Sequence, residues 1–164
     1  MTTCPVSRRR VLAAGSAALW PWWAGSARAH HGWSSFDQTR PLYLEGRAAT
    51  VQWRNPHVEL VLELAGDLQL PADLKQRVLP RQTAPVDGPA LLAAAQLPTR
   101  RDKRWTIELA PLTRVQAWQV PEIQPGTPLA VLGFGFDGEK GEPVLRAEYV
   151  FVGGKAYGMR SSPA

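Results

Sequence analysis

The strongest constraint on the fold is a strict alternation of side chains over residues 57–64. Its apolar members occupy every second position: Val58, Leu60, Leu62 and Leu64. Between them lie His57, Glu59, Val61 and Glu63. A period of two places one set on each face of a β-strand, so this segment is predicted to be a half-buried strand.

Further strand signals lie on both sides of this segment. Residues typical of strands are concentrated at 42–53, 105–109, 129–136 and 144–152. Arg54-Asn55-Pro56 supplies a turn between the first two strands, because proline disfavours the helical region for the residue before it. Residues 112–118 indicate one helical turn. The order predicts a mainly β fold, a small antiparallel five- or six-stranded barrel like the oligonucleotide/oligosaccharide-binding (OB) architecture.

A proline-rich insertion interrupts the strand pattern at residues 65–103. Its prolines lie at 71, 80, 85, 89 and 98. They separate two pieces, 73–79 and 90–97, that are predicted to be short helices, with Pro89 suited to a first helical turn. The predicted organisation is an N-terminal arm at 30–41, a barrel domain at 42–158 that includes the insertion, and a C-terminal tail at 159–164.

The first 29 residues have the features of a twin-arginine signal peptide. Ser7-Arg8-Arg9-Arg10-Val11-Leu12 is followed by an apolar stretch, and Ala27-Arg28-Ala29 places small residues where a signal peptidase reads them. We expect cleavage after Ala29 and a periplasmic location. The apolar run is short for a membrane span and contains Gly15, Pro21 and Gly25, so no stable membrane insertion is expected after cleavage.

The positive charge of the chain belongs mainly to this segment. The formal net charge is +5, but four of the 19 basic residues precede the expected cut, which leaves 15 basic against 14 acidic residues. A nearly neutral mature chain has no basic surplus for binding nucleic acid. The single cysteine, Cys4, also precedes the cut, so a thiolate site is not expected in the mature protein.

The catalytic motifs in the sequence lack their structural context. Residues 133–138 match the dinucleotide pattern G-x-G-x-x-G, but Gly141 and Pro143 follow where a phosphate cradle needs the start of a helix. A hairpin turn around Asp137 and Gly138 explains the same residues. No paired acids or nucleophile–base spacing stand out, so a non-enzymatic protein is predicted.

Three early histidines are the candidate site. They are His30, His31 and His57, and cleavage makes His30 the first residue. Its free α-amine and ring nitrogen then chelate one metal ion, with a second imidazole from His31 or His57. Nitrogen-rich tetragonal sites favour Cu(II). Glu59, about 7 Å from His57 on the same face of the strand, is a further candidate metal ligand or hydrogen-bond acceptor. In the alternative, His57 packs at the strand start and His30 and His31 merely follow the cut.

Several segments resemble an exported family of unknown function, the domain family numbered 6152. They are His30-His31-Gly32-Trp33, Phe36-Asp37, Leu44-x-Gly46, Val51-x-Trp53-x-Asn55-Pro56-His57 and Pro125-Gly126. The resemblance covers most of the mature chain apart from residues 65–103, and this chain departs from it in that insertion and in Gly32, where many members have serine. It implies a small exported β-barrel domain and brings no established activity.

Two functions follow as expectations. The first is an exported binding or accessory protein that holds Cu(II) through His30, His31 and His57, with Glu59 as a further candidate. The second is a structural partner subunit of an exported redox enzyme, without a ligand of its own. Co-purification of a periplasmic protein partner separates the second from the first.

Overall fold

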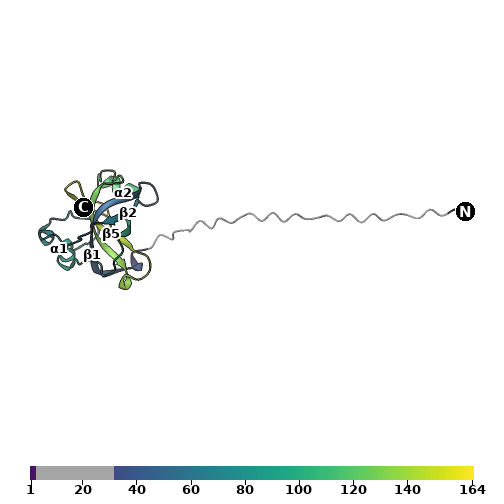
Figure 1. Ribbon diagram of the computed structural model, residues 1–164. Helices are drawn as coiled ribbons and strands as arrows, with labels where there is room; N and C mark the ends of the chain where they lie inside the picture. The colour runs from purple at the N-terminus through teal and green to yellow at the C-terminus, as the bar shows by residue number, and fades with distance from the viewer. Residues whose placement is uncertain (3–31) are drawn as a thin grey trace. The chain divides into compact units, whose positions relative to one another are not determined.

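A six-stranded sheet is the framework of the folded domain in the computed structural model, which describes residues 1–2 and 32–164 (Figure 1). The strands are β1 (Phe36–Gln52), β2 (Glu59–Leu64), β3 (Arg104–Glu108), β4 (Pro128–Phe136), β5 (Val144–Val152) and β6 (Lys155–Gly158). Two short helices accompany them, α1 (Gly88–Ala94) and α2 (Leu112–Ala117). The mainly β fold predicted from the sequence is confirmed.

The strand pairings return to their starting strand. The order is β3-β2-β1-β4-β5-β6, and β3 also pairs with β5. The pairing of β3 with β5 is parallel, from Thr106–Val144 to Glu108–Arg146, whereas the other pairings among the described strands are antiparallel. The antiparallel sheet expected from the sequence is thus correct except at this pairing. The pairings run β1, β2, β3, β5, β4 and back to β1.

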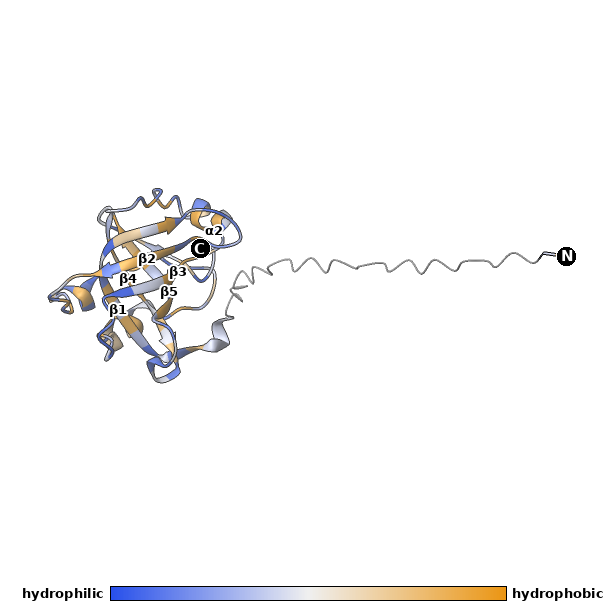
Figure 2. Ribbon diagram, turned by 45° about the vertical axis from the view of Figure 1, so that its right-hand side comes forward, coloured by the Kyte–Doolittle hydropathy of each residue, from blue (hydrophilic) through white to orange (hydrophobic). Residues whose placement is uncertain are grey.

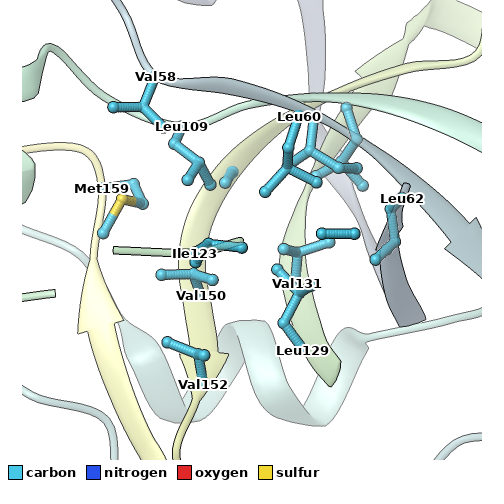
Figure 3. Packing of buried hydrophobic residues seen from close by; sticks show 14 of the residues in the cluster. Val58, Leu60, Leu62, Leu109, Ile123, Leu129, Val131, Val150, Val152 and Met159 are labelled. Carbon is cyan, nitrogen blue, oxygen red and sulfur yellow. The ribbon is translucent and has the colours of Figure 1, made fainter. Parts of the chain in front are cut away.

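The main core lies inside this ring of strands. Val58, Leu60 and Leu62 are at most 1% exposed, which confirms the inward face predicted from the alternation. Figure 3 shows them pointing toward side chains from the other elements, labelled Leu109, Ile123, Leu129, Val131, Val150, Val152 and Met159. Hydrophobic and hydrophilic segments alternate along the strand ribbons in Figure 2. Burial of this inward face is the main favourable contribution to folding.

Strand β1 begins earlier than predicted. The predicted arm at 30–41 is corrected here, because residues 36–41 belong to β1 and Trp33–Ser35 forms a 3-10 turn. Phe36 is 5% exposed and stacks on Phe136 with ring centroids 5.0 Å apart. Pro41 lies within β1. It directly follows the irregular stretch in which the β1–β4 register shifts, between Phe36 and Pro41. Proline is tolerated at such irregular strand positions, where its missing N–H costs no ladder hydrogen bond.

The insertion at residues 65–103 covers the outside of β1, β4 and β5. It contains α1 and a 3-10 turn at Leu74–Gln76, so the two predicted helical pieces are right in position and too long. Asp87 caps α1 by accepting a hydrogen bond from the Ala90 amide at 3.0 Å. A second apolar cluster joins the insertion to the sheet through Leu74, Leu92, Tyr43, Leu132 and Tyr149.

The chain after β5 remains part of the folded domain. Gly153 and Gly154, with φ of 59° and 75°, make a tight turn into β6, which the sequence reading had not predicted as a strand. In the predicted tail, Met159 is fully buried and Ser162 accepts a hydrogen bond from the Thr83 amide at 3.0 Å. Residues 159–162 therefore pack against the sheet and the insertion instead of extending from them.

A buried carboxylate joins three segments at the β4–β5 loop. Glu139, with 3% of its side chain exposed, lies 2.7 Å from the Arg40 guanidinium and accepts hydrogen bonds from the Thr99 and Arg100 amides. Burial acts to raise the pKa of Glu139, but the two amides and the Arg40 charge outweigh burial and hold that pKa below its ordinary value. This carboxylate ties the start of β1 and the end of the insertion to the hairpin loop.

Replacing Glu139 is expected to destabilise the domain. Glu139→Ala leaves Arg40 and two amides without their acceptor, and should lower the free energy of unfolding by about 3 kcal/mol. Urea unfolding of the purified domain measures this. The matched control is Glu142→Ala in the same loop, at an exposed residue, which should change stability by less than about 0.5 kcal/mol.

The loss should also depend on pH. Because the folded-state pKa of Glu139 is lowered, its stabilising contribution is complete above the ordinary glutamate pKa and is lost as pH falls through the folded value. The stability difference between the parent and Glu139→Gln should therefore shrink in acid. A difference that grows in acid would contradict this assignment.

Candidate functional site

His57 and Glu59 flank Val58, the inward-facing residue directly before β2. Val58 is fully buried, and its backbone bonds to Ala110 (N–H to O, 2.9 Å) and Leu109 (O to N–H, 3.0 Å) extend the ladder toward β3. Strand alternation therefore turns His57 and Glu59 away from the core. Both are half-buried. Two of the four predicted site residues thus share one outward side of the sheet.

Glu59 begins a rung of paired residues that crosses four strands. It is in register with Glu108 of β3, Glu108 with Arg146 of β5, and Arg146 with Phe134 of β4. We call these four outward-facing residues the outer rung. Facing side chains on neighbouring strands have Cβ atoms about 5 Å apart, so the outer rung is a continuous row of side chains, of which Glu108, Arg146 and Phe134 are buried.

The middle of the outer rung is a buried ion pair. The Arg146 Nη1 lies 3.0 Å from the Glu108 Oε2, and the two side chains are 8% and 10% exposed. Since each charge has its partner, the pair is held in one geometry. The Arg146 Nε is buried and has no partner among the described residues.

Trp33 lies against the far end of the outer rung. Its ring is 5.3 Å from the Arg146 Cζ and 3.9 Å from the Arg160 Cζ, both cation–π distances. It also meets Phe134 edge to face, with centroids 6.4 Å apart and planes at 75°. The indole is therefore held between two guanidinium groups and an aromatic ring.

Arg160 is itself fixed by a fully buried carboxylate. The Arg160 Nε and Nη2 each lie 2.7 Å from the Glu148 Oε2, and Gln82 donates to the Glu148 Oε1 at 3.0 Å. Glu148 is 0% exposed. It joins β5, the insertion and the segment after β6 at one point, and that segment supplies one of the two cations on Trp33.

The Glu148 interaction is expected to be far stronger than an exposed ion pair of the same type. Glu148→Ala removes the carboxylate to which Arg160 and Gln82 donate. It should lower the free energy of unfolding by about 3–5 kcal/mol. Glu63→Ala removes an exposed pair with Arg104 at 3.4 Å and should cost less than about 1 kcal/mol. Equal losses in denaturant unfolding would contradict the role given to Glu148.

The other two predicted ligands, His30 and His31, lie outside the described residues, as does nearly all of the predicted signal peptide. Within residues 1–2 and 32–164, no group of three or more His, Cys, Asp or Glu side chains is arranged to hold a metal ion. The described part alone thus brings together His57 and Glu59 and no complete site.

The sequence reading missed the ion pairs of the outer rung and the role of Trp33. A signal was present: Arg146 and Glu148 are charged residues within the otherwise apolar strand Val144–Val152. Charges inside such a strand indicate paired, buried groups. The hairpin predicted around Asp137 and Gly138 is confirmed by the antiparallel β4–β5 pairing.

Comparison with known families gives one match. Residues 22–69 match the model of DUF6152, a family of unknown function. The predicted family resemblance is confirmed. The DUF6152 match contains Trp33, His57 and Glu59, whereas Glu108, Arg146 and Arg160 lie beyond it. No curated protein and no solved structure matches the chain.

None of the helices in the described part of the chain has the length and apolar character needed to cross a membrane. The longer of its two α-helices, α1, covers Gly88–Ala94.

Proposed function

We propose that this protein is exported by the twin-arginine route, loses its first 29 residues and acts in the periplasm as a non-enzymatic binding or accessory domain. Its ligand is Cu(II), held by the α-amine and ring of His30 with imidazoles from His31 and His57. Glu59 is a candidate ligand or hydrogen-bond acceptor at the same site. Nitrogen-rich tetragonal coordination is the chemistry that selects Cu(II) among divalent ions.

We also propose that the six-stranded sheet forms an OB-like barrel. Its support is the ring of pairings β1-β2-β3-β5-β4, the parallel contact of β3 with β5, and the position of α2 between β3 and β4. OB-like barrels bind their ligands on an outer strand face and its bordering loops. The outer rung lies on such a strand face and His57 lies in the loop between β1 and β2, and both support the proposal.

One observation carries the copper proposal. Trp33, three residues after His30, contacts Arg146 and Phe134 of the outer rung that begins at Glu59. Three residues of chain span at most about 10 Å, which is the greatest reach of the His30 α-amine from Trp33. From Trp33 the contacts run through Arg146 and Glu108 to Glu59, two residues from His57. This arrangement of the described residues supports the proposal that the mature N-terminus and His57 contribute to one site.

Copper titration of the correctly cleaved protein tests the proposal. We expect one Cu(II) per chain, bound more tightly than micromolar by isothermal titration calorimetry. His57→Ala should weaken binding about tenfold or more, the scale on which single groups at metal sites act. Retaining one extra residue before His30 should also weaken binding, because it removes the α-amine from the chelate.

The matched control is Glu63→Gln, on the outward face of the same strand and further from His57. It should leave copper affinity unchanged. Affinity weaker than micromolar, or equal affinity in the parent and His57→Ala, would remove the three-histidine site. Mass spectrometry of the exported protein checks that His30 is its first residue.

The alternative function, a partner subunit of an exported redox enzyme, is favoured by one surface feature. Val78 in the insertion is 90% exposed beside a hollow of about 410 Å³ lined in part by Phe151 and Ala156. If this function is correct, affinity purification from the native periplasm should recover a stoichiometric redox enzyme, and Val78→Asp should abolish its recovery. Isolation as a copper-loaded monomer would argue against it.

A further inference from the structure

Strand β6 leaves an open edge at one end of the sheet. It is last in the strand order and pairs with β5 alone among the described strands. The two-residue turn at Gly153 and Gly154 makes Val152 and Lys155 a hydrogen-bonded pair. Bonded and non-bonded pairs alternate along an antiparallel ladder, so the N–H and C=O groups of Ala156 point away from β5. Within the described part of the chain, no backbone group bonds to either of them.

A hollow of about 410 Å³ adjoins this edge. Phe151 and Ala156, which are paired across β5 and β6, line it together with Val78 of the insertion. Val78 is 90% exposed, against 39% for Leu70, the other exposed large apolar residue within residues 32–164. Exposed apolar side chains gathered at a hollow mark contacts with other molecules. The hollow is therefore suited to an apolar side chain of a partner.

The charged side chains at the hollow are mainly positive. Arg77 and Lys155 line it with a single acid, Asp73. The Asp73 Oδ2 lies 3.0 Å from the Arg77 Nε, so this acid is already paired. The Arg77 guanidinium also lies 5.4 Å from the centroid of the Phe151 ring. Lys155 is exposed and has no ion pair among the described residues. A positive charge is thus left beside the open edge.

The neighbouring segment of the insertion is basic as well. Residues 74–86 contain Lys75, Arg77 and Arg81 and no acidic residue. Lys75 and Arg81 are both exposed. Complementary charge across an interface favours one partner and rejects others, so this surface favours an acidic partner. A second copy of this chain, paired through the same edge, would bring two such positive surfaces together.

We propose that β6 binds an extended, acidic segment of a partner protein by strand addition. The segment pairs with the backbone of Ala156, places an apolar side chain in the hollow between Phe151 and Val78, and sets an acidic side chain beside Lys155. In strand addition, main-chain hydrogen bonds give affinity and pockets for alternate side chains give specificity. This inference goes beyond both proposed functions, because it needs neither Cu(II) nor a redox enzyme as the partner.

Two synthetic peptides of about eight residues, within the usual length of a strand, test the preferred charge. One alternates valine with glutamate and the other alternates valine with lysine. Each carries a fluorescent label, and fluorescence anisotropy measures its binding to the purified exported protein. We expect the valine–glutamate peptide to bind saturably and the valine–lysine peptide to bind at least about tenfold more weakly. Lys155→Glu should reduce this preference about threefold or more.

Two variants place the peptide on β6. Ala156→Pro removes the backbone N–H at the open edge, and proline is tolerated at an edge position whose N–H points away from the neighbouring strand. Val78→Asp puts a negative charge at the hollow. Each should weaken binding of the valine–glutamate peptide about tenfold, which is the effect of losing one hydrogen bond or one apolar contact.

The matched control is Leu70→Asp, which makes the same kind of change at the other exposed apolar residue. It should leave peptide affinity unchanged. Circular dichroism and thermal unfolding check that each variant is folded. If Ala156→Pro is not folded, Val78→Asp and Lys155→Glu still locate the peptide, since both change exposed side chains.

Three outcomes overturn the inference. They are no saturable binding of the valine–glutamate peptide up to about 1 mM, equal affinity for the two peptides, and an affinity that the β6 and hollow variants leave unchanged. The first shows that the edge takes no such strand, and the last shows that the peptide binds elsewhere. Copper titration of the same variants should give the parent affinity, so failure of peptide binding is distinguishable from failure of the copper proposal.

Discussion

The parallel pairing of β3 with β5 is the contact on which the rest of the structure depends. It joins the hairpin of β1 and β2, through β3, to the later hairpin of β4 and β5, and the Thr106 amide extends it by donating to the Pro143 carbonyl at 2.8 Å. Without it, β3 and β5 would each expose an unpaired edge and the core would open along one side. It also sets Glu108 beside Arg146, so the same register that completes the ring creates the ion pair of the outer rung.

The outer surface of this ring is divided between two kinds of cover. On β1, β4 and β5, the insertion buries apolar side chains such as Tyr43 and Leu132 under Leu92. Across the outer rung, the cover is made of ion pairs and a single indole. Burying charges costs free energy that an apolar cover avoids, so their retention here is consistent with a requirement for one defined geometry.

The sequence predicted what periodicity encodes and missed what depends on partners. Alternation at Val58, Leu60 and Leu62 identified β2 and its buried face, because a period of two is a local property. The start of β1 was missed because Phe36 is buried by stacking on Phe136, one hundred residues later in the sequence. The parallel β3–β5 contact was missed for the same reason, since alternation shows which face is buried and carries no information on the neighbouring strand.

The candidate site shows the same contrast between local sequence pattern and contacts with distant residues. His57 and Glu59 could be placed on one face of β2 from spacing alone. Their connection to Trp33 could not, because it passes through Glu108 and Arg146, which come from two later strands. Charged residues within an apolar strand indicated that Arg146 and Glu148 had partners without showing which ones.

The bond between Glu148 and Arg160 has a consequence for the order in which the domain is completed during synthesis. Strand β5 carries a carboxylate that ends up fully buried, and its countercharge is 12 residues further along the chain. Until the ribosome has released Arg160, burying Glu148 leaves a charge without compensation, so the final packing of β5 waits for that residue. The last residues of the chain thus complete the charge pairing of β5, and the same Arg160 supplies the second guanidinium group on Trp33.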